Sequence, residues 1–179
     1  MTSMPTTPTA DDITRAVLAE ANAVFDQCQT KIEHCLAQLT DEQVWWRPHE
    51  SLNSIGNLVL HLSGNVRQWI VSGIGEAPDV RRRPAEFSEQ GPIPKATVLH
   101  QLATVVAEAK SVLDRATTEG MLTERRIQGF NVTGWGALFH TLPHFNGHTQ
   151  EIICLTRMQL GDRYRFHWQP ASPEQGASV

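Results

Sequence analysis

The apolar residues of this chain recur in steps of three and four along four separate stretches, and Leu18, Phe25 and Ile32 mark the first of them. Because an α-helix has about 3.6 residues per turn, this spacing gathers apolar side chains on one helix face, which must be buried. The pattern predicts helices over about residues 11–39, 51–73, 95–118 and 133–160, with a short helical turn at 41–45.

Polar residues and glycines set the limits of these stretches. Side-chain oxygens at a helix start accept hydrogen bonds from the free amides of the first turn, and glycine is favoured just beyond a helix end. The predicted caps are Asp11 or Asp12, Ser51 or Asn53, and Thr133, and the predicted stops are Gly73 or Gly75, and Gly161.

Residues 73–94 are rich in glycine and proline, show no sustained period, and predict a long crossover loop between the second and third helices. No segment alternates well enough to predict a strand. Four amphipathic helices bury their apolar faces most simply in an all-α four-helix bundle, which is the predicted fold class. The 179 residues are expected to form one domain, 1–179, with an ordered core of about 11–170 and frayed termini.

The charge of the chain narrows the classes of partner. Its 15 Lys and Arg residues against 19 Asp and Glu residues give a formal charge of −4 without a basic stripe, so we expect no nucleic-acid partner. No apolar run reaches the roughly 20 residues of a membrane-spanning helix, and no secretory signal is recognisable. The three cysteines are an odd number and are expected to be reduced. We therefore predict a cytoplasmic protein with no membrane partner.

Three histidines, His140, His144 and His148, follow one another at intervals of four on the last predicted helix. Each step of four adds about 40° of rotation, so His148 lies nearest the apolar face and His140 is turned toward solvent. Two imidazoles at i and i+4 can bind one metal ion, and His144 and His148 are the better placed pair. Without a further ligand, such a pair is more often an ordinary polar pair.

His61 offers that further ligand. It lies at the edge of the apolar face of the second predicted helix and could lean toward the fourth helix. Alone, it would more often be a core-edge histidine bonded to Asn57 or Asn65. Together with the pair it provides three nitrogen ligands. Three protein ligands leave at least one coordination position of the metal open, which is typical of catalytic rather than structural zinc sites. Glu151 would close that position if it served as a fourth ligand.

The segments SIGNLVLHLSGNVRQWI and LFHTLPHFNGHTQEI resemble the DinB-like (DinB/YfiT-like) metalloenzymes, and the resemblance extends over nearly the whole chain. That family is a four-helix bundle whose metal is held by one histidine on the second helix and a His-x-x-x-His pair on the last. The resemblance implies that His61, His144 and His148 are the metal ligands. The implied ion is expected to be a divalent transition metal, with Zn or Ni expected first and Fe, Co and Mn as alternatives.

One position departs from the family pattern. Family members commonly carry Gln three residues after the last histidine, where this chain has Glu151. Three roles stay open for Glu151: it could orient a ligand, act as a base toward bound water, or be an exposed acid.

The resemblance also implies an activity. Relatives include metal-dependent transferases and isomerases that use a low-molecular-weight thiol such as mycothiol or bacillithiol, and others are described as hydrolases. It implies a homodimeric enzyme that acts on a small-molecule substrate by activating a metal-bound thiol or water, with catalytic residues unassigned. The alternative is a non-catalytic metal-binding or regulatory helical-bundle dimer.

The arginine run Arg81–Arg83 lies in the predicted crossover loop. Guanidinium groups bind carboxylates, so the run could hold an anionic thiol or substrate. The alternative is a solvated loop whose arginines pair with Asp79 or Glu86. The tryptophans could line a pocket or form plain core and dimer contacts, and no site is assigned to Trp45, Trp46 or Trp69.

Overall fold

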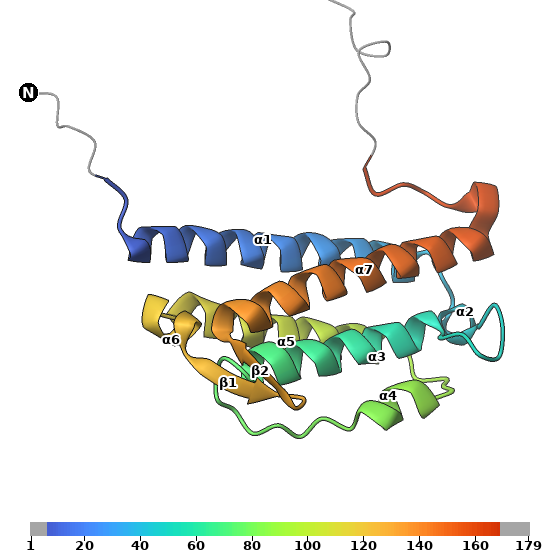
Figure 1. Ribbon diagram of the computed structural model, residues 1–179. Helices are drawn as coiled ribbons and strands as arrows, with labels where there is room; N and C mark the ends of the chain where they lie inside the picture. The colour runs from blue at the N-terminus through green and yellow to red at the C-terminus, as the bar shows by residue number, and fades with distance from the viewer. Residues whose placement is uncertain (1–6, 169–179) are drawn as a thin grey trace, which may run out of the picture.

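The computed structural model of the chain describes residues 7–168, which are mostly helical (Figure 1). The long helices are α1 (Ala10–Ala37), α3 (Ile55–Val66), α5 (Lys95–Arg115) and α7 (Gly134–Leu160), and the π-helix η1 (Arg67–Ser72) continues α3. Helix α1 packs on α5 and α7, and α3 packs on the same two helices. These helices occupy the four stretches that the apolar spacing predicts.

Short elements connect the long helices. The predicted turn at 41–45 is confirmed as α2 (Asp41–Trp45). The crossover loop contains α4 (Arg83–Ser88), which packs on α3 and which periodicity did not predict. Helix α5 ends before the predicted residue 118 because the Thr117 side chain caps a separate helix, α6 (Thr118–Leu122). The chain after α7 forms a 3-10 turn, η2 (Gly161–Arg163).

A β-hairpin joins α6 to α7, so the expectation of no strand is wrong. Strands β1 (Glu124–Ile127) and β2 (Phe130–Thr133) pair antiparallel, with Ile127 opposite Phe130. The two turn residues, Gln128 and Gly129, both have positive φ, of 51° and 86°. Two such residues give a tight turn whose twist matches that of the flanking strands. The turn therefore favours the hairpin even though apolar and polar residues alternate only weakly along the strands.

Two of the predicted helix caps are wrong. Thr9 caps α1, and Asp12 accepts a hydrogen bond from the Thr9 amide in return. Ser54 caps α3 with the same reciprocal arrangement toward Asn57. In both helices the capping residue and the polar residue three positions later bond to each other's backbone amides. The predicted caps Asp11, Asp12, Ser51 and Asn53 do not make this reciprocal arrangement. The Thr133 cap and the stops at Gly73 and Gly161 are confirmed.

The core lies between the long helices and contains the predicted apolar stripes. Phe25 of α1 is fully buried and meets Phe145 of α7 edge to face, with ring centroids 5.3 Å apart. Cys28 and Cys35 are buried and free, whereas Cys154 is free and exposed. No helix among residues 7–168 is long and apolar enough to cross a membrane. The termini predicted to be frayed lie largely outside these residues.

Replacing Phe25 by Ala should lower the free energy of unfolding by about 3–5 kcal/mol, because the buried ring leaves a cavity between α1 and α7. Urea unfolding followed by circular dichroism measures the change. The matched control is Phe139→Ala on α7, since Phe139 is 62% exposed and should cost less than about 1 kcal/mol. Equal losses in the two variants would contradict this description of the core.

Candidate metal centre

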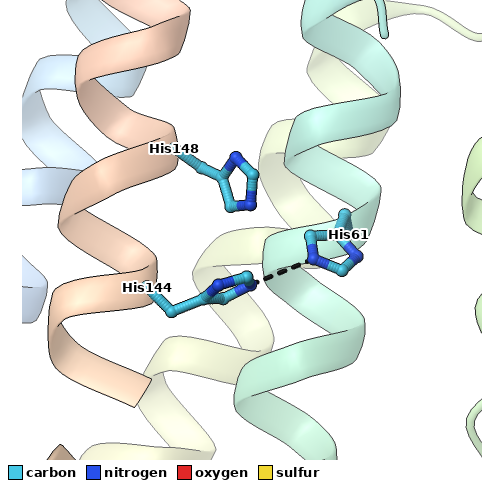
Figure 2. A group of neighbouring side chains, drawn as sticks. All are labelled: His61, His144 and His148. Carbon is cyan, nitrogen blue, oxygen red and sulfur yellow. Dashed lines mark hydrogen bonds between the residues drawn. The ribbon is translucent and has the colours of Figure 1, made fainter. Parts of the chain in front are cut away.

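The structure brings together the three histidines that the sequence predicts as ligands. His61 projects from α3, and His144 and His148 project from α7 toward it (Figure 2). One ring nitrogen from each lies within 4.8 Å of the other two. The Nε2 atoms of His61 and His144 are 3.0 Å apart. Segments more than eighty residues apart in the sequence therefore meet at one point of the α3–α7 contact.

Two of the three imidazoles have a carboxylate within hydrogen-bond distance of Nδ1. The Nδ1 atom of His61 lies 2.9 Å from Glu86 Oε2, and the Nδ1 atom of His148 lies 2.8 Å from Glu151 Oε2. A carboxylate accepts from Nδ1–H, which leaves the Nε2 lone pair free to face the other rings. Of the three roles considered for Glu151, this contact favours orientation of a ligand.

Glu86 is a residue of the site that sequence reasoning missed. It belongs to α4 and is 8% exposed. The Arg81 guanidinium donates to both of its oxygens, at 2.7 and 2.8 Å. The predicted pairing of the arginine run with Glu86 is therefore confirmed, but the pair is not solvated, since the Arg81 side chain is only 3% exposed.

The Glu86 carboxylate can approach α3 this closely because residue 64 is glycine. A Cβ atom at Gly64 would lie 2.0 Å from Glu86 Oε1, well inside van der Waals contact. Burial by itself would raise the pKa of Glu86, but hydrogen bonds from Arg81 and His61 outweigh it and hold this pKa below its usual value. Glu86 is therefore an anion at neutral pH, as an acceptor for His61 Nδ1–H must be.

Arg81 also approaches His61 directly. Its Nη2 atom is 3.2 Å from His61 Nδ1, and its Nη1 atom donates to Gln68 Oε1 at 2.9 Å. A guanidinium can only donate, so Nδ1 either donates to Glu86 or accepts from Arg81. The shorter contact is to Glu86, and that tautomer leaves His61 Nε2 available as a ligand.

The aromatic residues around the site divide into separate roles. His140 stacks on Trp69 with ring centroids 3.8 Å apart, and it lies outside the three-histidine group, as predicted. Phe87 of α4 packs on the His61 ring at 4.8 Å. Trp45 belongs to the buried core and donates from Nε1 to the Ile93 carbonyl at 2.9 Å.

Electrostatics favour the neutral form of His144. Its pKa is lowered from 6.5 to about 4, first by burial and then by the neighbouring histidines and Arg81, which disfavour a further positive charge. Burial lowers the pKa of His140 as well. A neutral imidazole presents a lone pair, which is the form that a metal ion needs.

The donor set fits a metal ion with nitrogen ligands. Two imidazoles on one tetrahedral zinc ion, each at about 2.0–2.1 Å, hold their nitrogens roughly 3.3–3.4 Å apart. The 3.0 Å between the His61 and His144 nitrogens needs only a small opening to reach that value. Within residues 7–168 no fourth histidine, cysteine or carboxylate joins the group, so an ion held there would keep an open position.

Acid should destabilise the metal-free protein through His144. Its folded-state pKa of about 4 lies below the unfolded value of 6.5, so the unfolded chain takes up the proton first as the pH falls. We expect stability to fall between pH 6.5 and 4, by on the order of 1–3 kcal/mol from this group. Urea unfolding at a series of pH values measures this loss. The loss of stability should be smaller in His144→Gln than in the wild type, and the control His100→Gln should lose as much as the wild type. The same fall in all three proteins would contradict the assignment.

Comparison with known proteins places the chain in a family. None of the curated proteins matches the sequence. A crystal structure of a conserved protein from Enterococcus faecalis is similar in fold, with a TM-score of 0.68 and 19% sequence identity over 81% of this chain and 98% of that one. The family described as "Protein of unknown function (DUF1572)" matches residues 12–170. The chain therefore belongs to the DUF1572 family.

Proposed function

We propose that His61, His144 and His148 bind one divalent transition metal ion and that the protein is a metal-dependent enzyme acting on a small molecule. The observation that carries the proposal is the convergence of three imidazoles, two of them held at Nδ1 by a carboxylate. Metal-binding histidines almost always donate their second ring N–H to a carboxylate, a carbonyl or water, whereas histidines that merely cluster at a surface do not require such a hydrogen bond.

The residues of the chain would divide the work as follows. Glu86 and Glu151 hold His61 and His148 with Nε2 toward the ion, and the low pKa of His144 keeps that ring neutral near pH 7. When bound, the ion would supply the Lewis acidity that lowers the pKa of a thiol or of water toward neutrality. Arg81 neutralises the buried charge of Glu86, so the site carries no uncompensated anion behind His61.

The resemblance to the DinB-like metalloenzymes supplies the reaction class. We propose a single-domain four-helix bundle of that type, with thiol-dependent transfer or isomerisation as the first reaction and hydrolysis as the second. The homodimer remains a prediction. The non-catalytic alternative predicts that the protein binds the ion but neither consumes a thiol in the presence of an electrophile nor hydrolyses an ester. Assays of both reactions, with His144→Ala/His148→Ala as the inactive control, separate these cases.

Metal binding should be lost when the histidines are replaced. Protein stripped with chelator, dialysed and titrated with Zn²⁺ or Ni²⁺ in a calorimeter should bind about one ion per chain, because three imidazoles form one site. His61→Ala and the His144→Ala/His148→Ala double variant should bind at least about a hundredfold more weakly. His100→Ala, which removes an exposed histidine on α5, is the matched control and should bind like the wild type. Unchanged binding in the double variant would overturn the proposal.

Gly64→Ala should weaken metal binding without touching a ligand. The added methyl would displace the Glu86 carboxylate, and losing the partner of a ligand histidine typically costs about 10–100-fold in affinity. The matched control is Gly147→Ala, next to His148, where a Cβ meets no atom within 4 Å. That control should bind metal normally and gain up to about 1 kcal/mol of helix stability. Equal affinities in the two variants would show that Glu86 does not position His61.

A further inference from the structure

A cavity of about 670 Å³ lies on the other side of the Arg81–Glu86 pair from the three histidines. Its walls come from α3, from the start of η1, from residues 80–93 and from α5, and none of the three histidines lines it. A volume of this size is within the range of roughly 300–1,000 Å³ that small-molecule sites occupy. The cavity is therefore a separate site from the metal centre, although the two share Glu86 and Arg81 as a wall.

The segment that covers the cavity is fixed to α3 by hydrogen bonds. Asn57 Nδ2 donates to the Glu86 carbonyl at 2.9 Å and to the Glu89 carbonyl at 2.8 Å. Arg47 Nη2 donates to the same Glu89 carbonyl at 3.1 Å. Because these bonds hold the C-terminal half of α4 in place, the space between this segment and α5 is built into the fold and requires no opening movement.

The walls are mainly apolar, and every charged side chain on them except one makes a hydrogen bond within residues 7–168 of the protein. The apolar lining residues are Leu60, Val80, Ala85, Ile93 and Val105.

Arg81 pairs with Glu86, and Arg67 Nη1 donates to Glu108 at 2.7 Å. Glu89 accepts from the amides of residues 90 and 91 at 3.0 and 2.8 Å. The Arg82 side chain lines the cavity, and its guanidinium makes no hydrogen bond or ion pair with any residue in the described part of the chain; only the Arg82 backbone carbonyl is bonded, to the Ala85 amide at 2.9 Å. One guanidinium is thus available beside an apolar chamber.

We propose that this cavity binds an amphipathic small molecule with an apolar body and one carboxylate-type anionic group. The apolar walls would bury the body of the ligand, which is favourable in proportion to the apolar area removed from water. Arg82 would hold the anionic group, because a guanidinium fork matches the two oxygens of a carboxylate. The site needs no metal, so this proposal stands apart from the proposed function.

Octanoate is a suitable probe, and octan-1-ol is its uncharged counterpart. Calorimetric titration of metal-free protein should detect octanoate binding at one site per chain and weaker binding of the alcohol. Arg82→Ala should weaken octanoate about tenfold and leave octan-1-ol unchanged, since only the anionic contact is removed. The matched control is Arg83→Ala: Arg83 lies over the Phe87 ring at 5.0 Å and does not line the cavity. Equal effects of the two substitutions, or no octanoate binding by the wild type, would overturn the proposal.

A second pair of variants tests the location without using charge. Thr104 is an exposed residue of α5 that lines the cavity, and Ala96 is an exposed residue of α5 that does not. Thr104→Trp would place a large side chain in the chamber and should weaken octanoate and octan-1-ol by about tenfold or more, while Ala96→Trp should change neither. Circular dichroism checks that both variants fold. Retained binding of both probes in a folded Thr104→Trp protein would place their site elsewhere and refute the inference.

Discussion

The contact between α3 and α7 is the constraint on which the candidate site depends. It brings the Nε2 atoms of His61 and His144 to 3.0 Å from each other, although the two residues are 83 positions apart in the sequence. Burial at this contact, together with the neighbouring histidines and Arg81, lowers the pKa of His144 to about 4, so that this ring is neutral at neutral pH. The same packing that forms the core therefore brings three imidazoles to one place.

The crossover segment contributes as much to the site as the long helices do. Arg81 and Glu86 place a buried ion pair between the metal centre and the cavity beneath residues 80–89. Burying two charges costs free energy. The hydrogen bond from His61 to the Glu86 carboxylate offsets part of this cost. Gly64 permits this arrangement, because any side chain there would occupy the position of the Glu86 carboxylate.

Much of this could be predicted from the sequence, and the failures have physical causes. The apolar spacing predicted the long helices, and the intervals of four favoured His144 and His148 over His140, because both follow directly from helical geometry. His61 was only a possible third ligand from its place on the second helix, and the family resemblance completed the set. Glu86 could not be found this way, since its role depends on how an aperiodic segment folds back over α3. The hairpin was missed because its signal is a two-residue turn at Gln128 and Gly129, not the alternation of its short strands. The caps at Thr9 and Ser54 were within reach, since each is followed three residues later by a polar partner.

The central claim is that three imidazoles hold one metal ion through Nε2. X-ray absorption spectroscopy at the zinc edge, on protein loaded with one equivalent of Zn²⁺, tests it most directly. The expected first shell has three imidazole nitrogens at about 2.0–2.1 Å and at least one oxygen ligand from solvent. A first shell with fewer than three imidazoles, or one built from sulfur or carboxylate oxygen alone, would contradict the claim.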